Sequence, residues 1–216
     1  RRSIADNMAR SARTVARVVH FVEVDMRSAV QFRNEHREQY RANGAELTFN
    51  AVLIKATALA MREHPALNIS FEGNTIRRHA NINIGLAVAL DEGLITVSVK
   101  NGDKKDLQTI CRESAKLIEK ARKGNLQVDE VTGSSITVSS LGTYEIDCFT
   151  PIINLPEVAI IGVGSIIEKP VAKNGGIFVA PVMKLSLSFD HRAVDGAPAA
   201  RFLQILKRRL EEMKDF

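Results

Sequence analysis

The stretch LSLSFDHRAVDG, residues 185–196, marks the end of one predicted strand, a short turn and the start of a predicted helix. Apolar residues at positions 183, 185, 187 and 189 alternate with mostly polar ones, a period typical of a strand with one apolar face. From Ala199 to Met213, apolar residues recur every three or four positions, as in a helix with one buried side. We therefore expect His191 and Asp195 in a strand-to-helix connection, where functional side chains are often held.

Helices and strands are mixed along the rest of the chain. We expect helices starting near Ser3 and over 26–42, 49–63, 107–121 and 199–213, and strands over 15–24, 67–71, 76–77, 82–90, 94–99, 135–139, 157–167 and 177–189. Ser3, Asp25, Thr48 and Asp106 are placed to cap helices. Strict strand–helix alternation is missing, so the pattern predicts an α/β protein of the α+β kind, with a mixed sheet and helices packed on it. The absence of repeats and linkers favours a single domain, 1–216.

Composition narrows the class of protein. The 216 residues, 45% of them hydrophobic, suffice for one sizeable core. The sequence shows neither a bilayer-spanning apolar run nor a signal-peptide pattern. Two cysteines without C-x-x-C spacing favour a reducing, cytoplasmic compartment. The net charge of +5 suits an anionic ligand, whereas two tyrosines and no tryptophan argue against a nucleic-acid stacking surface.

His191 has two interpretations. It is either a loop histidine, with Asp195 as the N-cap of the last helix, or a general base held at a strand end. Asp190, Arg192 and Asp195 surround it with charge, which can tune a histidine near neutral pH. A neutral imidazole at this position could take a proton from a thiol, whose usual pKa is about 8.5.

Ser139 is the second candidate. It ends the strand Ile136-Thr137-Val138, and its hydroxyl could donate a hydrogen bond to a developing oxyanion. A serine at an ordinary strand-to-turn junction is an equal alternative. No G-x-S-x-G surrounds it, so we do not expect a nucleophile.

Other sites receive little support. The remaining histidines lack metal-ligand spacing, so we expect no metal. Cys148 has no histidine near it in sequence, and we expect it to be structural. Gly162 and Gly164 lie in an apolar strand without the third glycine of a dinucleotide loop, which indicates close packing of backbones.

Four motifs, in order, resemble the catalytic core of dihydrolipoamide acyltransferases, the core subunits of 2-oxoacid dehydrogenase complexes. DHRAVDG at 190–196 resembles the family's D-H-R-x-x-D-G, and SITVSSLG at 135–142 resembles its serine-bearing strand. The segment 149–164 and the opening RRSIA with Met8 are also similar, so the resemblance covers nearly the whole chain. It implies a chloramphenicol-acetyltransferase-like sandwich, because that enzyme shares the fold and an H-x-x-x-D-G motif.

The resemblance also implies an activity, that of a dihydrolipoyllysine-residue acyltransferase, with an acetyl or branched-chain acyl group. The acyl group would move between the dihydrolipoyl thiol and the thiol of coenzyme A without an acyl-enzyme. His191 would be the general base, and Ser139, from a neighbouring subunit, would stabilise the oxyanion. Asp195 would order the site by pairing with an N-terminal arginine. Arg1 occupies the family's position for this arginine and would be a substrate-binding residue.

The resemblance further implies partners. Trimers would assemble into a hollow shell through an apolar C-terminus, here Leu210, Met213 and Phe216. The lipoyl group would be carried on a separate domain, and the 2-oxoacid dehydrogenase and dihydrolipoamide dehydrogenase components would be partners. Lipoyl and peripheral subunit-binding domains are not recognised within 1–216, and neither nucleic acid nor a membrane is expected as a partner.

Three segments depart from the family pattern: Ala16-Arg17, 93–97 and 143–147. They leave the acyl group open, whether acetyl, branched-chain or succinyl. The rival interpretations are a chloramphenicol-type O-acetyltransferase, a shell-forming scaffold whose catalysis has decayed and, with least support, a nucleic-acid-binding module.

Overall fold

The structure is a computed structural model that describes residues 2–91, 93–173 and 175–216. Its helices are α1 (Arg2–Thr14), α2 (Arg27–Ala42), α3 (Phe49–Glu63), α4 (Leu107–Arg122) and α5 (Gly196–Glu212), with 3-10 turns η1 (Pro65–Leu67), η2 (Val128–Glu130) and η3 (Gly142–Tyr144). Its strands are β1 (Arg17–Asp25), β2 (Ile69–Glu72), β3 (Thr75–Arg78), β4 (Ile84–Leu90), β5 (Gly93–Val99), β6 (Ile136–Ser140), β7 (Ala159–Lys173) and β8 (Gly176–Asp190). Among the described helices, none is long and apolar enough to cross a bilayer.

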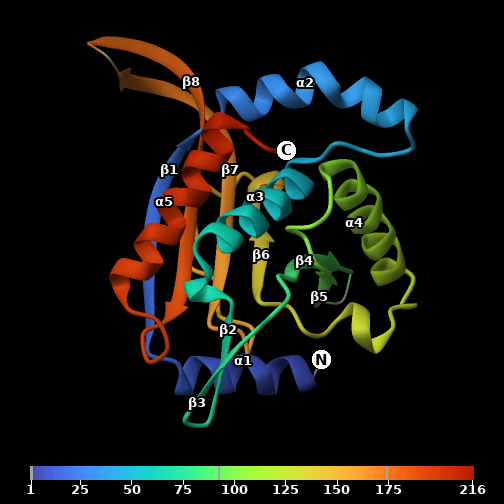
Figure 1. Ribbon diagram of the computed structural model, residues 1–216, viewed down its shortest axis with the longest axis vertical. Coiled ribbons are helices and arrows are strands. Elements are labelled where there is room, and N and C mark those ends of the chain that lie inside the picture. The colour runs from blue at the N-terminus through green and yellow to red at the C-terminus, as the bar shows by residue number, and fades with distance from the viewer. Residues whose placement is uncertain (1, 92, 174) are drawn as a thin grey trace.

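A six-stranded sheet organises the molecule (Figure 1). Its strand order is β1-β8-β7-β6-β4-β5, and β2 and β3 form a separate two-stranded hairpin. Strand β6 runs parallel to both β4 and β7, while the other neighbouring pairs of the large sheet are antiparallel. The predicted mixed sheet is therefore confirmed. The first and last strands of the chain, β1 and β8, are neighbours in this sheet, so both ends of the chain contribute to one core.

Helices α3 and α5 cover one face of the sheet (Figure 1). Residues 51–61 of α3 are all buried, as expected for a helix that is apolar nearly all round. Thr48 caps α3 by accepting a hydrogen bond from the Ala51 amide at 3.2 Å, and Asp106 caps α4 by accepting one from the Thr109 amide at 2.6 Å. Both predicted caps are confirmed.

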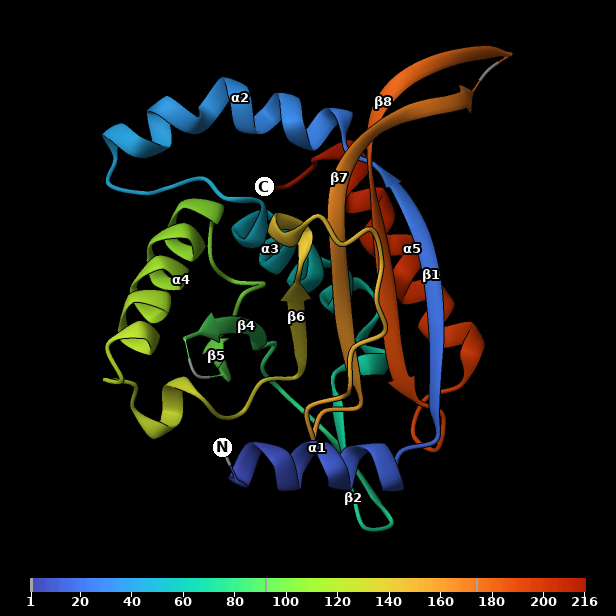
Figure 2. The same ribbon diagram turned by 180° about the vertical axis from the view of Figure 1, so that it is seen from behind.

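The other face of the sheet is covered by chain without regular structure. The connection between η3 and β7 runs along this face, while α1 crosses one end of the sheet and α2 lies at the opposite end (Figure 2). The Ser186 hydroxyl donates to the Phe149 carbonyl at 2.6 Å, and the Ser11 hydroxyl of α1 donates to the Ile153 carbonyl at 2.7 Å. The 149–154 segment is thus held between α1 and the sheet.

Three predicted boundaries were wrong. Helix α1 already begins at Arg2, so Ser3 lies inside the helix and is not its cap. Met26 occupies the N-cap position of α2, because Asp25 ends β1 and its carboxylate pairs with Arg27 at 2.5 Å. Strand β7 extends to Lys173, beyond the expected end at 167, because the β7–β8 ladder continues past the body of the sheet. The expected turn residue Asn174 lies outside the described residues.

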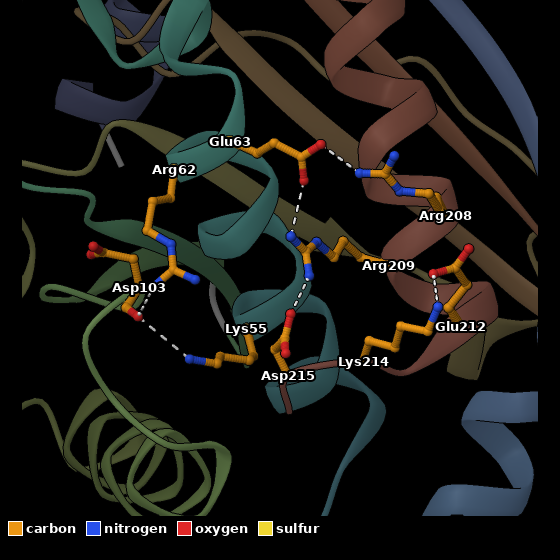
Figure 3. Close-up of polar contacts among 9 residues, drawn as sticks. All are labelled: Lys55, Arg62, Glu63, Asp103, Arg208, Arg209, Glu212, Lys214 and Asp215. Atoms are coloured by element: carbon orange, nitrogen blue, oxygen red, sulfur yellow. Dashed lines mark hydrogen bonds and ion pairs between the residues drawn. The ribbon is translucent and has the colours of Figure 1, made fainter.

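The C-terminal segment folds back onto its own chain. Leu210 is fully buried in the core, and the ring of Phe216 lies 6.4 Å from that of Phe32 on α2. Arg209 holds the segment from the side by pairing with Glu63 at 2.9 Å and Asp215 at 2.8 Å (Figure 3). The expectation that Leu210 reaches a neighbouring copy is therefore wrong, whereas Met213 and Phe216 are only half-buried and that part stays a prediction.

Candidate active site

His191 lies in the turn directly after β8. Its amide donates to the Ala16 carbonyl at 2.9 Å, next to the last β1–β8 pair, Arg17 with Asp190. The Asp190 carbonyl accepts hydrogen bonds from the Ala193 and Val194 amides, which closes the turn. His191 is therefore held at a strand end, as expected. The imidazole itself is exposed, with its ring 6.0 Å from that of Phe189.

Two of the charged residues beside His191 pair with each other. Asp190 is only 2% exposed, and its carboxylate binds the Arg192 guanidinium at 2.6 Å. Arg192 also lies over the ring of Phe71, 4.8 Å from its centre. These two charges can pair because residues two positions apart at a strand end point to the same side. The expectation that these charges tune His191 stays a prediction, and their pairing stiffens the turn.

Asp195 stands at the N-cap position of α5, with φ −75° and ψ 162°. Its exposed side chain makes no capping hydrogen bond, and it takes part in none of the ion pairs found among the described residues. Asp195 therefore occupies the N-cap position, as the alternative of a simple capping aspartate requires. Its carboxylate, however, makes no capping hydrogen bond. Arg1, the expected partner of this carboxylate, lies outside the described residues.

Ser139 is near the end of β6 and lines a cavity of about 590 Å³. The cavity walls come from α1, β4, β5, β6 and the 149–154 segment. They are mostly apolar and include Ile4, Met8, Leu90, Leu94, Ile95 and Ile152. Residues 93–96, one of the three departures from the family pattern, also line this cavity. The cavity can therefore receive an apolar chain beside a serine hydroxyl.

His191 and Ser139 do not meet within one chain. Ser139 pairs with Gly162 of β7, and Gly162 pairs with Ser186 of β8, five residues before His191. Strand geometry then separates the two residues by about 17 Å along β8 and about 10 Å across the strands, roughly 20 Å in total. A single thioester cannot contact both side chains of one copy.

Sequence reasoning missed a buried polar cluster at the wall of this cavity. Glu157 is 3% exposed, and the Thr137 hydroxyl lies 2.9 and 2.7 Å from its two carboxyl oxygens. The Asn154 amide donates to the same carboxyl at 3.3 Å. Burial raises the pKa of Glu157 to about 8. A signal was present in the sequence, since Glu157 is the one charged residue within the run from Pro156 to Ile161.

The expectation that Gly162 and Gly164 mark close packing of backbones is confirmed. A Cβ on Gly164 would lie 2.0 Å from the Asp147 carbonyl oxygen, and one on Gly162 would lie 2.4 Å from the Ser186 hydroxyl, so both glycines serve close packing as predicted. Cys111 and Cys148 are unpaired thiols. Burial raises the pKa of Cys111 to about 11, which makes it unreactive. Across the described ranges, His, Cys, Asp and Glu side chains form no cluster suited to a metal ion.

Comparison with solved structures first identifies the class of fold. A chloramphenicol acetyltransferase superposes with a TM-score of 0.62 at 15% identity, covering 95% of this chain and 94% of that one. The chain therefore has the chloramphenicol acetyltransferase fold, as expected.

The family follows from closer matches. The family of 2-oxoacid dehydrogenase acyltransferases (catalytic domain) matches residues 1–216, and the chain belongs to it. It is 41% identical, over 213 residues, to the dihydrolipoyllysine-residue acetyltransferase component of the pyruvate dehydrogenase complex of Staphylococcus aureus, covering 97% of this chain and 49% of that protein. The chain thus spans about half the length of the curated relatives it matches.

Two solved structures agree with this assignment. A probable dihydrolipoamide acetyltransferase from Listeria monocytogenes superposes with a TM-score of 0.95 at 38% identity, covering 100% of this chain and 92% of that one. The dihydrolipoamide acetyltransferase of Azotobacter vinelandii gives a TM-score of 0.95 at 36% identity, covering 98% and 88%. That protein was studied for the role of one serine, one histidine and one asparagine in its catalytic mechanism.

Proposed function

We propose that the chain transfers an acetyl group between the thiol of a dihydrolipoyl group and the thiol of coenzyme A. Sequence spacing is the observation that carries this proposal. In the Azotobacter protein, the mechanistic serine precedes the histidine by the same number of positions as Ser139 precedes His191. Its asparagine follows the histidine by four positions, as Asp195 follows His191. The acetyl group is favoured because the similar proteins are named acetyltransferases.

His191 acts as the general base in this proposal. Its neutral imidazole takes the proton from the attacking thiol, and the thiolate adds to the carbonyl carbon of the acetyl thioester. The new carbon–sulfur bond forms while the carbonyl π electrons move onto oxygen. When the tetrahedral intermediate collapses, the old carbon–sulfur bond breaks and the leaving thiolate recovers the proton from the imidazolium. No acyl-enzyme is needed.

Ser139 stabilises the oxyanion. Its hydroxyl donates a hydrogen bond to the negatively charged oxygen of the intermediate, a contribution that typically changes the rate about a hundredfold or more. The mostly apolar cavity that Ser139 lines supports this role, because charge–dipole interactions are stronger beside apolar walls than in bulk water. The same cavity can hold the acetyl group and the adjoining alkyl chain.

Asp195 is proposed to order the site and not to move protons. The Azotobacter protein has an asparagine at the equivalent spacing, and an amide cannot act as a base. The position at the start of α5, four residues after His191, suits a side chain that fixes a neighbouring loop.

Each active site is proposed to form between two copies of the chain. The separation of about 20 Å between His191 and Ser139 requires that one copy supply the base and another the oxyanion donor. A cyclic trimer satisfies this requirement three times over with one repeated interface. A relative at 36% identity forms the cubic core of the pyruvate dehydrogenase multienzyme complex, which supports a larger hollow shell here.

The remaining parts of the proposal concern the whole complex. Residues 1–216 act as one catalytic domain, since strands from both ends of the chain complete one sheet. The lipoyl substrate is carried on a separate domain, and the 2-oxoacid dehydrogenase and dihydrolipoamide dehydrogenase components are partners. The unpaired thiols Cys111 and Cys148 support a reducing compartment such as the cytoplasm.

Acyl transfer from a panel of acyl-coenzyme A thioesters to dihydrolipoamide tests the function directly. We expect acetyl-coenzyme A to be the preferred donor, and expect His191→Ala to remove most of the turnover. Transfer to alcohols in preference to dihydrolipoamide would instead support an O-acetyltransferase. An assembled protein without transfer from any donor would contradict the proposal and favour a scaffold.

A further inference from the structure

A chain of polar side chains links α1 to β6 along the wall of the Ser139 cavity. The Asn7 amide of α1 donates to the Asn154 side-chain oxygen at 3.1 Å. The Asn154 amide donates to Glu157 at 3.3 Å, and the carboxyl oxygens of Glu157 lie 2.7 and 2.9 Å from the Thr137 hydroxyl. Helix and strand are thus joined through one buried carboxyl group.

The partners of Glu157 are uncharged. They are Thr137, Asn154 and the Ser134 hydroxyl, and among the ion pairs of the described residues none involves Glu157. An ionised carboxylate buried without a cation is costly, and such a group takes up a proton instead. Burial accordingly raises the pKa of Glu157 to about 8. At neutral pH the group is a carboxylic acid, with one hydrogen to donate and a carbonyl oxygen to accept.

The linked residues line the cavity itself. Asn7, Thr137 and Asn154 all face it, together with Ser139. Thr137 and Ser139 are two positions apart on β6, so their side chains lie on the same side of the strand. Ser11, one helical turn after Asn7, binds the carbonyl of Ile153 and anchors α1 to the same segment. A change at Glu157 would therefore be transmitted to α1 and to the width of the cavity.

We propose that Glu157, as a neutral carboxylic acid, is a positioning residue that holds α1 against β6 and thereby sets the width of the acyl cavity beside Ser139. Glutamine keeps a donating group and an accepting carbonyl oxygen at the same place, whereas alanine removes the link. The part of this inference that concerns acyl groups rests on the proposed function. The part that concerns α1 does not.

Hydrogen exchange on the assembled protein tests the link to α1. Glu157→Gln should leave amide exchange in residues 4–14 unchanged, whereas Glu157→Ala should speed it about tenfold, the equivalent of losing one or two hydrogen bonds. Glu168→Gln, an exposed glutamate on β7, is the matched control. If Glu157→Ala fails to fold, Thr137→Val cuts the same link while keeping the carboxyl group, and it should also speed exchange. Unchanged exchange in a folded variant that lacks the link would overturn the proposal.

Infrared spectroscopy tests the protonation state. The carbonyl band of a neutral carboxylic acid should be present at pH 7, should be lost in Glu157→Gln, and should persist in Glu168→Gln. If Glu157→Gln instead loses a carboxylate band and keeps the carboxylic acid band of the unmodified protein, Glu157 is ionised and the proposal fails.

Kinetics test the consequence for substrates. In Glu157→Ala, KM for acetyl-coenzyme A should rise about tenfold while kcat stays within a few-fold, because the wider cavity binds a short acyl group less closely. The preference for longer acyl donors should increase, and Glu157→Gln should behave as the unmodified protein. Equal loss in the alanine and glutamine variants would contradict the positioning role. If the unmodified protein transfers no acyl group, the proposed function fails, and hydrogen exchange alone still decides whether Glu157 holds α1.

Discussion

At the scale of single residues, His191 combines an exposed imidazole with a backbone fixed on both sides. Its amide is bound to Ala16, and Asp190 and Arg192 pair beside it. We predict that His191→Ala lowers kcat by about 10²–10⁴, the usual contribution of a general base, with little change in melting temperature. Steady-state acyl transfer and thermal unfolding measure the two quantities. His79→Ala, a histidine that follows β3, is the control and should retain activity; equal losses in both variants would point to general damage.

Asp195 allows a sharper distinction between charge and hydrogen bonding. We predict that Asp195→Asn keeps kcat within about tenfold, whereas Asp195→Ala loses more, because asparagine retains the acceptor oxygen. Comparison of the two kcat values at one pH is sufficient. A loss in Asp195→Asn as large as in Asp195→Ala would mean that the negative charge is required.

Glu157 should make stability depend on pH. Its pKa is about 8 in the folded chain, above the value of 4.5 for an ordinary glutamate, so the folded state binds the proton more tightly. The associated stability is present below about pH 4.5 and is lost as pH rises to about 8. We predict that the free energy of unfolding of the unmodified protein falls relative to Glu157→Gln between these limits, by on the order of 3–5 kcal/mol. Urea unfolding at pH 5 and pH 9 measures the difference, and parallel curves would contradict it.

At the scale of elements, the close approach of β7 to the 145–149 segment positions the cavity wall. The Asp147 carbonyl oxygen occupies the space that a Cβ on Gly164 would need. We predict that Gly164→Ala lowers the free energy of unfolding by about 1–3 kcal/mol, the usual cost of overpacking. Gly196→Ala is the control, because its Cβ would meet His20 at an ordinary 3.9 Å. Chemical unfolding that shows equal stability for both variants would exclude this packing argument.

The helix caps and strand ends show where the local sequence pattern was sufficient to predict an element's boundary. Thr48 and Asp106 were correctly predicted as caps because a cap depends on residues within one helical turn. Asp25 and Ser3 satisfied the same rule but do not occupy the N-cap positions of their helices, because β1 continues through Asp25 and α1 begins earlier. The length of β7 was underestimated because its end is paired only with β8, outside the region where burial imposes alternation.

At the scale of the whole molecule, the separation of His191 from Ser139 predicts complementation between inactive variants. Assemblies of His191→Ala alone or Ser139→Ala alone should be nearly inactive. If the two are dissociated, mixed in equal amounts and reassembled, roughly a quarter of the sites should pair an intact histidine with an intact serine from another copy. Acyl transfer measured before and after reassembly tests this. Light scattering should show assemblies in multiples of three. Reassembled mixtures that recover no activity would mean that His191 and Ser139 act in the site of one chain.

Sequence alone determined the class of fold, the family and the two motifs that contain His191 and Ser139. Periodicity and short motifs record local geometry, and four ordered motifs leave few alternative folds. Only the tertiary structure decided which groups come together. It paired Asp190 with Arg192, placed His191 about 20 Å from Ser139 by strand register, and buried Glu157 among uncharged partners. These contacts join residues distant in sequence or depend on the burial that the complete sheet creates, and no local pattern specifies either.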